Sequence, residues 1–79
     1  MTSTADVRRI TTDPDICNGR PIVRGTRVTV ETILGYLGAG DSADDILQQY
    51  PQLTRDDISA CLAFASQLMS RKYSIKELS

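Results

Sequence analysis

The segment from Gly19 to Val30 constrains the fold of this chain more than any other. It reads Gly-Arg-Pro-Ile-Val-Arg-Gly-Thr-Arg-Val-Thr-Val, so twelve positions hold two glycines, one proline, three arginines and three valines. Short apolar runs typical of strands precede it, and apolar residues at helical spacing follow it. We therefore expect this segment to join a small β element to a helical bundle and to display its arginines.

A β ribbon is expected over residues 7–28. β-compatible residues at 7–11 are followed by the turn-forming Asp13-Pro14-Asp15 and by Asn18-Gly19, whose residues tolerate positive φ. A second strand follows at Pro21-Ile22-Val23. Two short strands are unstable alone, so the ribbon must pack on helices or pair with another chain. The sequence leaves open whether the strands pair within one chain or between two.

Three helices are expected over residues 30–38, 43–50 and 55–72. Each is preceded by a hydroxyl residue suited to an N-cap, namely Thr29, Ser42 and Thr54. Gly40 is a candidate left-handed cap after the first helix, and Pro51 stops the second. The predicted fold is mainly α, a three-helix core with an N-terminal ribbon, flanked by a loose arm at residues 1–6 and a tail at 73–79. The whole chain is expected to form one domain.

The third helix has apolar residues on two sides. Its main stripe is Ile58, Cys61, Leu62, Ala65, Leu68 and Met69, and Ala60 and Phe64 lie off that stripe. The packed ribbon or a dimer contact would cover the second side, and the sequence does not choose between them. Because a chain of 79 residues buries only about two-thirds of its unfolded surface, we expect a homodimer or another partner.

Composition argues against catalysis and cofactors. The chain has no histidine, and its two cysteines, Cys17 and Cys61, are far apart, so neither a zinc site nor a nucleophile–base pair is indicated. The acid pairs at 44–45 and 56–57 fall in the first turns of predicted helices, where they complement the helix dipole. We expect a non-enzymatic protein without cofactor or metal, and a cytoplasmic one, because no segment is apolar enough to span a membrane and the thiols are unpaired.

Charge is unevenly divided along the chain. Residues 1–28 carry five arginines and three aspartates, whereas residues 29–79 carry a net charge of −3. The second and third helices have helix-turn-helix spacing, yet the acids beside Arg55 would repel phosphate. The arginines that could instead contact nucleic acid or a partner are Arg8, Arg9, Arg20, Arg24 and Arg27. A structural role, such as pairing with acids or carbonyls, is the alternative, and it is slightly favoured for Arg27.

The run from Gly19 to Val30 resembles the hallmark of small bacterial proteins called domain of unknown function 433. The similarity begins at Asp13-Pro14 and continues through Gly40, Asp44-Asp45-Ile46-Leu47, Tyr50-Pro51, Leu53-Thr54 and Asp57-Ile58 to Ala63 and Ala65. It implies a homeodomain-like, helix-turn-helix fold with a β arm, and the antitoxin half of a toxin–antitoxin pair, often beside a PIN-like ribonuclease toxin. The Cys17-Asn18 pair departs from the family pattern, but only in the turn.

Our leading hypothesis is an antitoxin that binds a PIN-like toxin and its own operator DNA as a dimer. An arginine that neutralises the carboxylates of the toxin could come from Arg20, Arg24 or Arg27. The alternative source is the tail, with Arg71, Lys72, Tyr73, Ile75 and Leu78 as its contact residues. The competing hypothesis is a protein-interaction or dimerisation module without a role in DNA binding.

Overall fold

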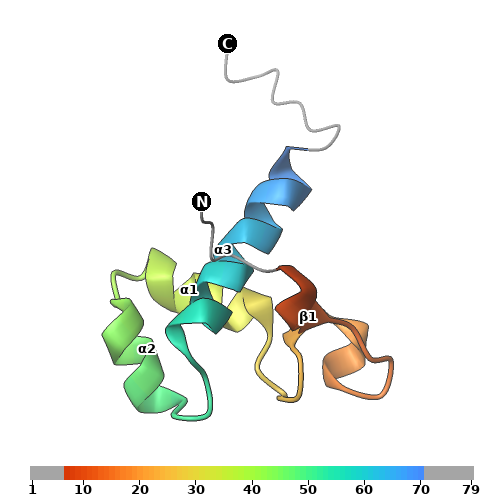
Figure 1. Cartoon of the computed structure of the whole chain (residues 1–79), viewed down its shortest axis with the longest axis horizontal. Coiled ribbons are helices and arrows are strands. Elements are labelled where there is room, and N and C mark those ends of the chain that lie inside the picture. Colours follow the sequence, from red (N-terminus) through yellow and green to blue (C-terminus); the bar gives the residue numbers. More distant parts are fainter. Residues whose placement is uncertain (1–6, 71–79) are drawn as a thin grey trace.

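The structure, a computed structural model, describes residues 7–70 and contains three helices and a short antiparallel ribbon (Figure 1). The expected mainly α fold, a three-helix core with an N-terminal ribbon, is confirmed. In chain order the elements are the 3₁₀ turn η1 (Val7–Arg9), β1 (Ile10–Thr11), the 3₁₀ turn η2 (Cys17–Gly19), β2 (Ile22–Val23), α1 (Val30–Gly38), α2 (Ala43–Gln49) and α3 (Arg55–Met69).

All three helices begin at the hydroxyl caps that the sequence indicated. The side chains of Thr29, Ser42 and Thr54 each accept a hydrogen bond from the backbone N–H of the third residue onward. At α2 and α3 the bond is reciprocated, because the carboxylates of Asp45 and Asp57 accept from the backbone N–H of the cap residue. These capping boxes satisfy backbone donors that have no partner inside the helix. The chain therefore fixes its helix starts by local chemistry.

The helix ends follow the same local logic. Gly40 takes a φ of +101°, the left-handed conformation expected after α1. Helix α2 ends at Gln49, one residue earlier than expected, with Tyr50 as its C-cap. Helix α3 ends at Met69, with Ser70 as its C-cap, whereas the sequence predicted a helix that extends to residue 72. Residues 71 and 72 lie outside the described residues. The predicted arm at 1–6 and tail at 73–79 also lie outside them.

The first strand is shorter than expected. Strand β1 pairs antiparallel with β2 within the chain, with Ile10 opposite Val23, but Val7–Arg9 form a 3₁₀ turn and not a strand. The backbone N–H of Arg24, directly after β2, donates to the carbonyl of Arg9 at 2.7 Å. Turn η1 packs against α3. We attribute the early end of the strand to this packing, which only the assembled helices provide.

The Asn18-Gly19 turn has the expected positive φ values, 59° and 79°. It lies inside η2, within the long connection from β1 to β2, and does not form a two-residue hairpin. The expected left-handed turn at this position is confirmed, but it is one part of the longer connection between β1 and β2.

A second hairpin joins the ribbon to α1. The N–H of Val23 donates to the carbonyl of Val28, and the N–H of Val30 donates to the carbonyl of Pro21, both at 2.9 Å. At its tip Gly25 has a φ of +83°, which a residue with a Cβ adopts only with strain. The hydroxyl of Thr26 bridges the two sides. The segment from Gly19 to Val30 is thus the joint that the sequence predicted.

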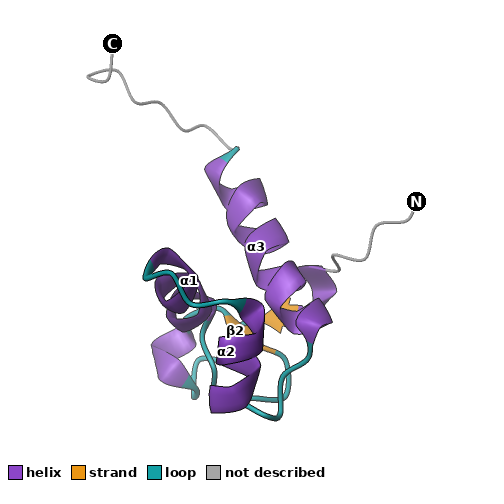
Figure 2. Cartoon of the chain, turned by 90° about the vertical axis from the view of Figure 1, so that its left-hand side faces the viewer, coloured by secondary structure: helices purple, strands orange, loops and turns teal. Residues whose placement is uncertain are grey.

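The core lies where the ribbon, α1, α2 and the first half of α3 meet. Its buried apolar residues are Ile10, Val23, Val28, Val30, Ile33, Ile46, Leu53, Ile58, Ala60 and Cys61. The second half of α3 rises beyond this body (Figures 1 and 2). Leu62, Leu68 and Met69 on that half are exposed by 49%, 56% and 54%. The helix is therefore a core element at its start and a projecting one at its end.

Candidate functional site

Arg9 ties the N-terminal turn to the start of α3. Its Nη1 donates to Oδ1 of Asp57 at 3.0 Å, and its Nη2 lies 3.6 Å from Oδ2 of Asp56. Asp57 is buried, and its second oxygen accepts from the N–H of Thr54 at 2.9 Å. A buried carboxylate needs this pairing, because an unpaired charge is costly to bury. Arg9, which the sequence offered as a binding residue, thus has a structural role.

Arg24 has the structural role that the sequence favoured for Arg27. Its Nε and Nη2 donate to the backbone carbonyl of Arg8 at 3.0 and 2.8 Å. Two parallel donors on one carbonyl use the fork geometry of the guanidinium group. Together with the backbone bond from Arg24 to Arg9, they hold η1 against the end of β2.

Arg20 and Arg55 form exposed ion pairs. Nη1 of Arg20 donates to Oε1 of Glu31 at 2.8 Å, and Nη2 of Arg55 donates to Oδ1 of Asp44. More than half of each of these four side chains is exposed. Such surface pairs contribute at most about 1 kcal/mol, so either arginine can exchange its partner at low cost.

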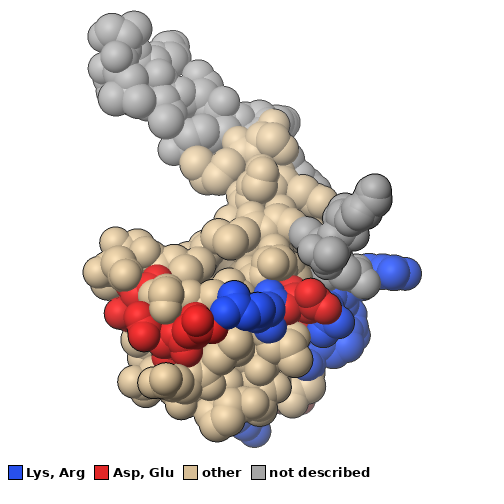
Figure 3. Space-filling view, turned by 60° about the vertical axis from the view of Figure 1, so that its left-hand side comes forward, with Lys and Arg blue, Asp and Glu red and all other residues tan. Residues whose placement is uncertain are grey.

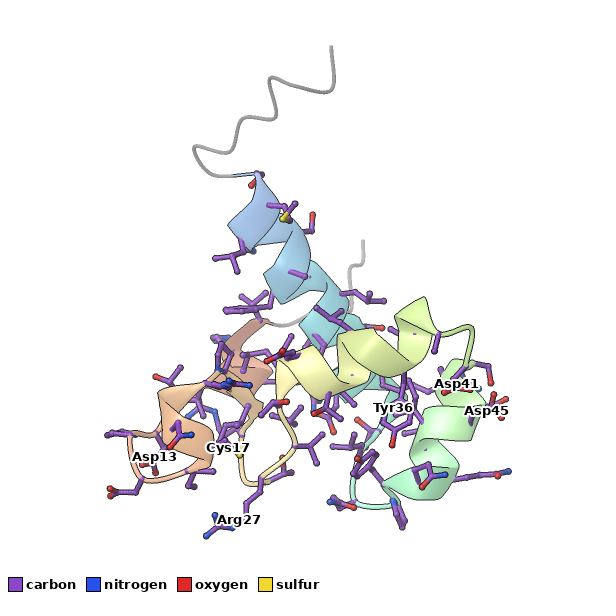
Figure 4. The ribbon with its side chains drawn as sticks, turned by 180° about the vertical axis from the view of Figure 1, so that it is seen from behind. Asp13, Cys17, Arg27, Tyr36, Asp41 and Asp45 are labelled. Carbon is purple, nitrogen blue, oxygen red and sulfur yellow. The ribbon has the colours of Figure 1, made fainter. Side chains whose placement is uncertain are left out.

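Arg27 differs from the other arginines considered. It is exposed near the tip of the second hairpin, and Figure 4 shows its side chain extending away from the body. Among residues 7–70 its guanidinium group forms no hydrogen bond or ion pair, and its backbone carbonyl accepts a bond of 3.3 Å from the Cys17 thiol. Arg27, for which the sequence slightly favoured a structural role, is therefore the arginine without a side-chain partner among residues 7–70.

The face of α2 and α3 alternates in charge. Figure 3 shows basic side chains next to acidic groups, with further basic side chains toward one edge of the view. The pairs Arg55–Asp44 and Arg9–Asp56 account for this alternation. A pocket of about 530 Å³ is lined by Arg8, Arg9, Arg24 and Asp57. The acids at the start of α3 are thus partly neutralised, and the surplus of positive charge lies on the ribbon side.

An apolar groove runs between α1 and α3. It has a volume of about 470 Å³ and is lined by Arg20, Pro21, Val30, Glu31, Leu34, Phe64, Ala65 and Leu68. The second apolar side of α3 is covered within the chain, because Ala60 is buried and Phe64 packs against the core. Turn η1 and strand β1 also pack against this helix. The apolar surface that the described residues leave accessible lies instead on the main stripe, at Leu62, Leu68 and Met69. The sequence could not reveal the α1 wall of this groove, because its residues read as ordinary core positions.

The two cysteines lie in different environments. Cys61 is fully buried, and burial, followed by the nearby Asp57 carboxylate, raises the pKa of its thiol to about 11. Cys17 is half-buried. Within residues 7–70, no three histidine, cysteine, aspartate or glutamate side chains gather as a metal site would require. No helix in that part of the chain has the length and apolar character needed to cross a membrane. The proposed toxin-contact residues, Arg71, Lys72, Tyr73, Ile75 and Leu78, lie outside the described residues.

Known proteins resemble this chain both in sequence and in structure. The uncharacterized protein y4eO of Sinorhizobium fredii (strain NBRC 101917 / NGR234) is 38% identical over 56 residues, which are 71% of this chain and 25% of that protein. The crystal structure of a DUF433 member protein from Anabaena variabilis ATCC 29413 superposes with a TM-score of 0.72 at 34% identity. That match covers 75% of this chain and 58% of the other. The chain thus spans only part of the length of these relatives.

The profile of a family described as "Protein of unknown function (DUF433)" matches residues 10–65. This range begins at β1, includes the arginine-bearing joint and ends within α3. Since the match extends over more than half of the sequence, the chain belongs to the domain of unknown function 433 family.

Proposed function

We propose that the protein is a non-catalytic antitoxin that binds a PIN-like ribonuclease toxin, and that Arg27 neutralises the carboxylates of the toxin. The supporting observation is the position of this side chain, exposed near a hairpin tip without a partner among the described residues. A guanidinium group matches a carboxylate with two parallel hydrogen bonds. The absence of histidine from the sequence supports a non-catalytic role.

The other arginines of the ribbon are less suited to this role. Arg24 would have to leave the Arg8 carbonyl, and Arg9 would have to leave a buried carboxylate. Arg20 would have to give up only an exposed pair with Glu31, so it ranks second. These contacts favour Arg27 over the other arginines of the ribbon, although the sequence slightly favoured a structural role for Arg27.

The test is rescue of cells from the toxin, with affinity measured on the purified pair. Arg27→Ala should weaken binding by roughly 10- to 100-fold, since a hydrogen bond to a charged group contributes about 1.5–3 kcal/mol. Arg55→Ala is the matched control, because Arg55 is also exposed but lies on the start of α3. Full rescue and unchanged affinity with Arg27→Ala would refute the role of this arginine. If Arg71→Ala/Lys72→Ala then abolished rescue, the tail would be the contact.

Binding of operator DNA is a second candidate function. It is supported by the short connection between the successive helices α2 and α3. The acids in the first turns of these helices are also partly neutralised, Asp44 of α2 by Arg55 and Asp56 of α3 by Arg9. A gel-shift assay with the DNA upstream of the gene tests it at low salt, where phosphate contacts are strongest. Loss of binding in Arg8→Ala/Arg55→Ala is the expected result. If the unmodified protein does not shift this DNA, the interaction module without a DNA role is the better description.

A neighbouring gene for a small nuclease-like protein is the simplest independent support for the antitoxin proposal. A toxin of that kind cleaves RNA, so the pair would work in the cytoplasm. The absence of such a gene in the source genome would favour the interaction module.

A further inference from the structure

We infer that the second half of α3 and the groove beside it form the interface with a second copy of this chain. Leu62, Leu68 and Met69 are each about half exposed on this half of the helix, and Phe64 and Ala65 line the groove beside them. An interface of this kind goes beyond the proposed function, because it depends on neither a toxin nor DNA.

The apolar residues form one continuous face. At about 100° per residue, the positions of Phe64, Leu68, Ala65, Met69 and Leu62 follow one another around roughly 160° of the helix. Ala65 lies at the middle of this arc. A partner helix that packs over Ala65 therefore meets the groove on one side and the exposed Leu62 and Met69 on the other.

The charge of this surface suits a second copy. Residues 60–70 contain no charged side chain, so two copies would meet there without repulsion. At the rim of the groove, Arg20 and Glu31 lie side by side as one positive and one negative group. In a two-fold contact, each sign can face its opposite on the other copy, and each contact occurs twice. Nucleic acid would instead require positive charge, which this surface does not offer.

An antiparallel arrangement fits this face. In an antiparallel pair the dipoles of the two helices oppose each other, whereas a parallel pair would bring like helix ends together. In an antiparallel pair with Ala65 at the two-fold axis, Leu62 of one copy faces Leu68 of the other. The exposed Leu62 then enters the groove of its partner, and the small side chain of Ala65 permits close approach of the helices. Figure 4 shows Arg27 and the end of α3 at opposite ends of the view, so the dimer would leave both Arg27 side chains accessible.

The test is the molar mass of the full chain, measured by sedimentation or light scattering. The dimer should have twice the 8.7 kDa of the single chain. Leu62→Glu/Leu68→Glu should be monomeric, because two like charges then face each other at both copies of the contact. Gln67→Glu, on the opposite side of α3, is the matched control and should remain dimeric. Unchanged circular dichroism would show that the variants fold.

A variant with complementary charges tests the antiparallel register of the two α3 helices. In Leu62→Lys/Leu68→Glu, the antiparallel arrangement places lysine opposite glutamate twice, so part of the dimer should return relative to the double glutamate variant. A monomeric unmodified chain at the highest soluble concentration would overturn the inference. So would a Leu62→Glu/Leu68→Glu variant that stays dimeric, or a Leu62→Lys/Leu68→Glu variant as monomeric as the double glutamate.

Discussion

The buried carboxylate of Asp57 should be the most sensitive polar group in the fold. Asp57→Ala removes the bond from Arg9 and the capping bond from the N–H of Thr54. The ion pair between Asp57 and Arg9 contributes to the free energy of unfolding near the lower end of the usual range of about 1.5–3 kcal/mol, because the side chain of Arg9 is 42% exposed. A lost capping interaction costs about 0.5–2 kcal/mol. We therefore expect a loss of about 2–3 kcal/mol, which lowers the melting temperature by roughly 10–20 °C in a domain of this size.

The assay is urea unfolding followed by circular dichroism, with the adjacent Asp56 as control. Asp56→Ala should change the free energy of unfolding by less than about 0.5 kcal/mol, because that side chain is 55% exposed and its oxygen lies 3.6 Å from Arg9. Asp57→Asn keeps an acceptor for Thr54 but removes the charge, so it should fall between the two. Equal losses in Asp56→Ala and Asp57→Ala would refute the argument that burial gives Asp57 its importance.

Three further predictions concern the two cysteines and Gly25. Labelling with a thiol reagent at pH 8 should modify Cys17 quickly and Cys61 only on unfolding, because Cys61 is buried and its thiol pKa is raised to about 11. Because the raised pKa favours the neutral thiol in the folded state, ionisation of the Cys61 thiol destabilises the fold. The free energy of unfolding should therefore be unaffected by this thiol below pH 9 and should fall as the pH rises to about 11. In Cys61→Ala this fall should be smaller. Gly25→Ala should cost about 1–2 kcal/mol in thermal unfolding, although no atom blocks the new methyl group, because the φ of +83° disfavours a Cβ. An unchanged melting temperature would contradict that explanation.

The sequence by itself predicted the features that depend on neighbouring residues. The caps at Thr29, Ser42 and Thr54 bond to residues three positions away, so their chemistry is present in the local sequence. The positive φ of Asn18 and Gly40 likewise follows from residue type and position. The family could be identified for a similar reason, because the run from Gly19 to Val30 is a continuous motif.

The tertiary structure decided which arginines have structural partners. Arg9 bonds to a residue 48 positions away, and Arg24 to a carbonyl 16 positions before it, distances at which spacing carries no information. For the same reason the sequence could not foresee that Val7–Arg9 would form a 3₁₀ turn against α3, or that one end of α3 would be covered and the other exposed. Arg27 became the leading candidate only because folding gave partners to the arginines around it. Residue chemistry thus determined the elements, and long-range packing determined which of their side chains remain available for binding.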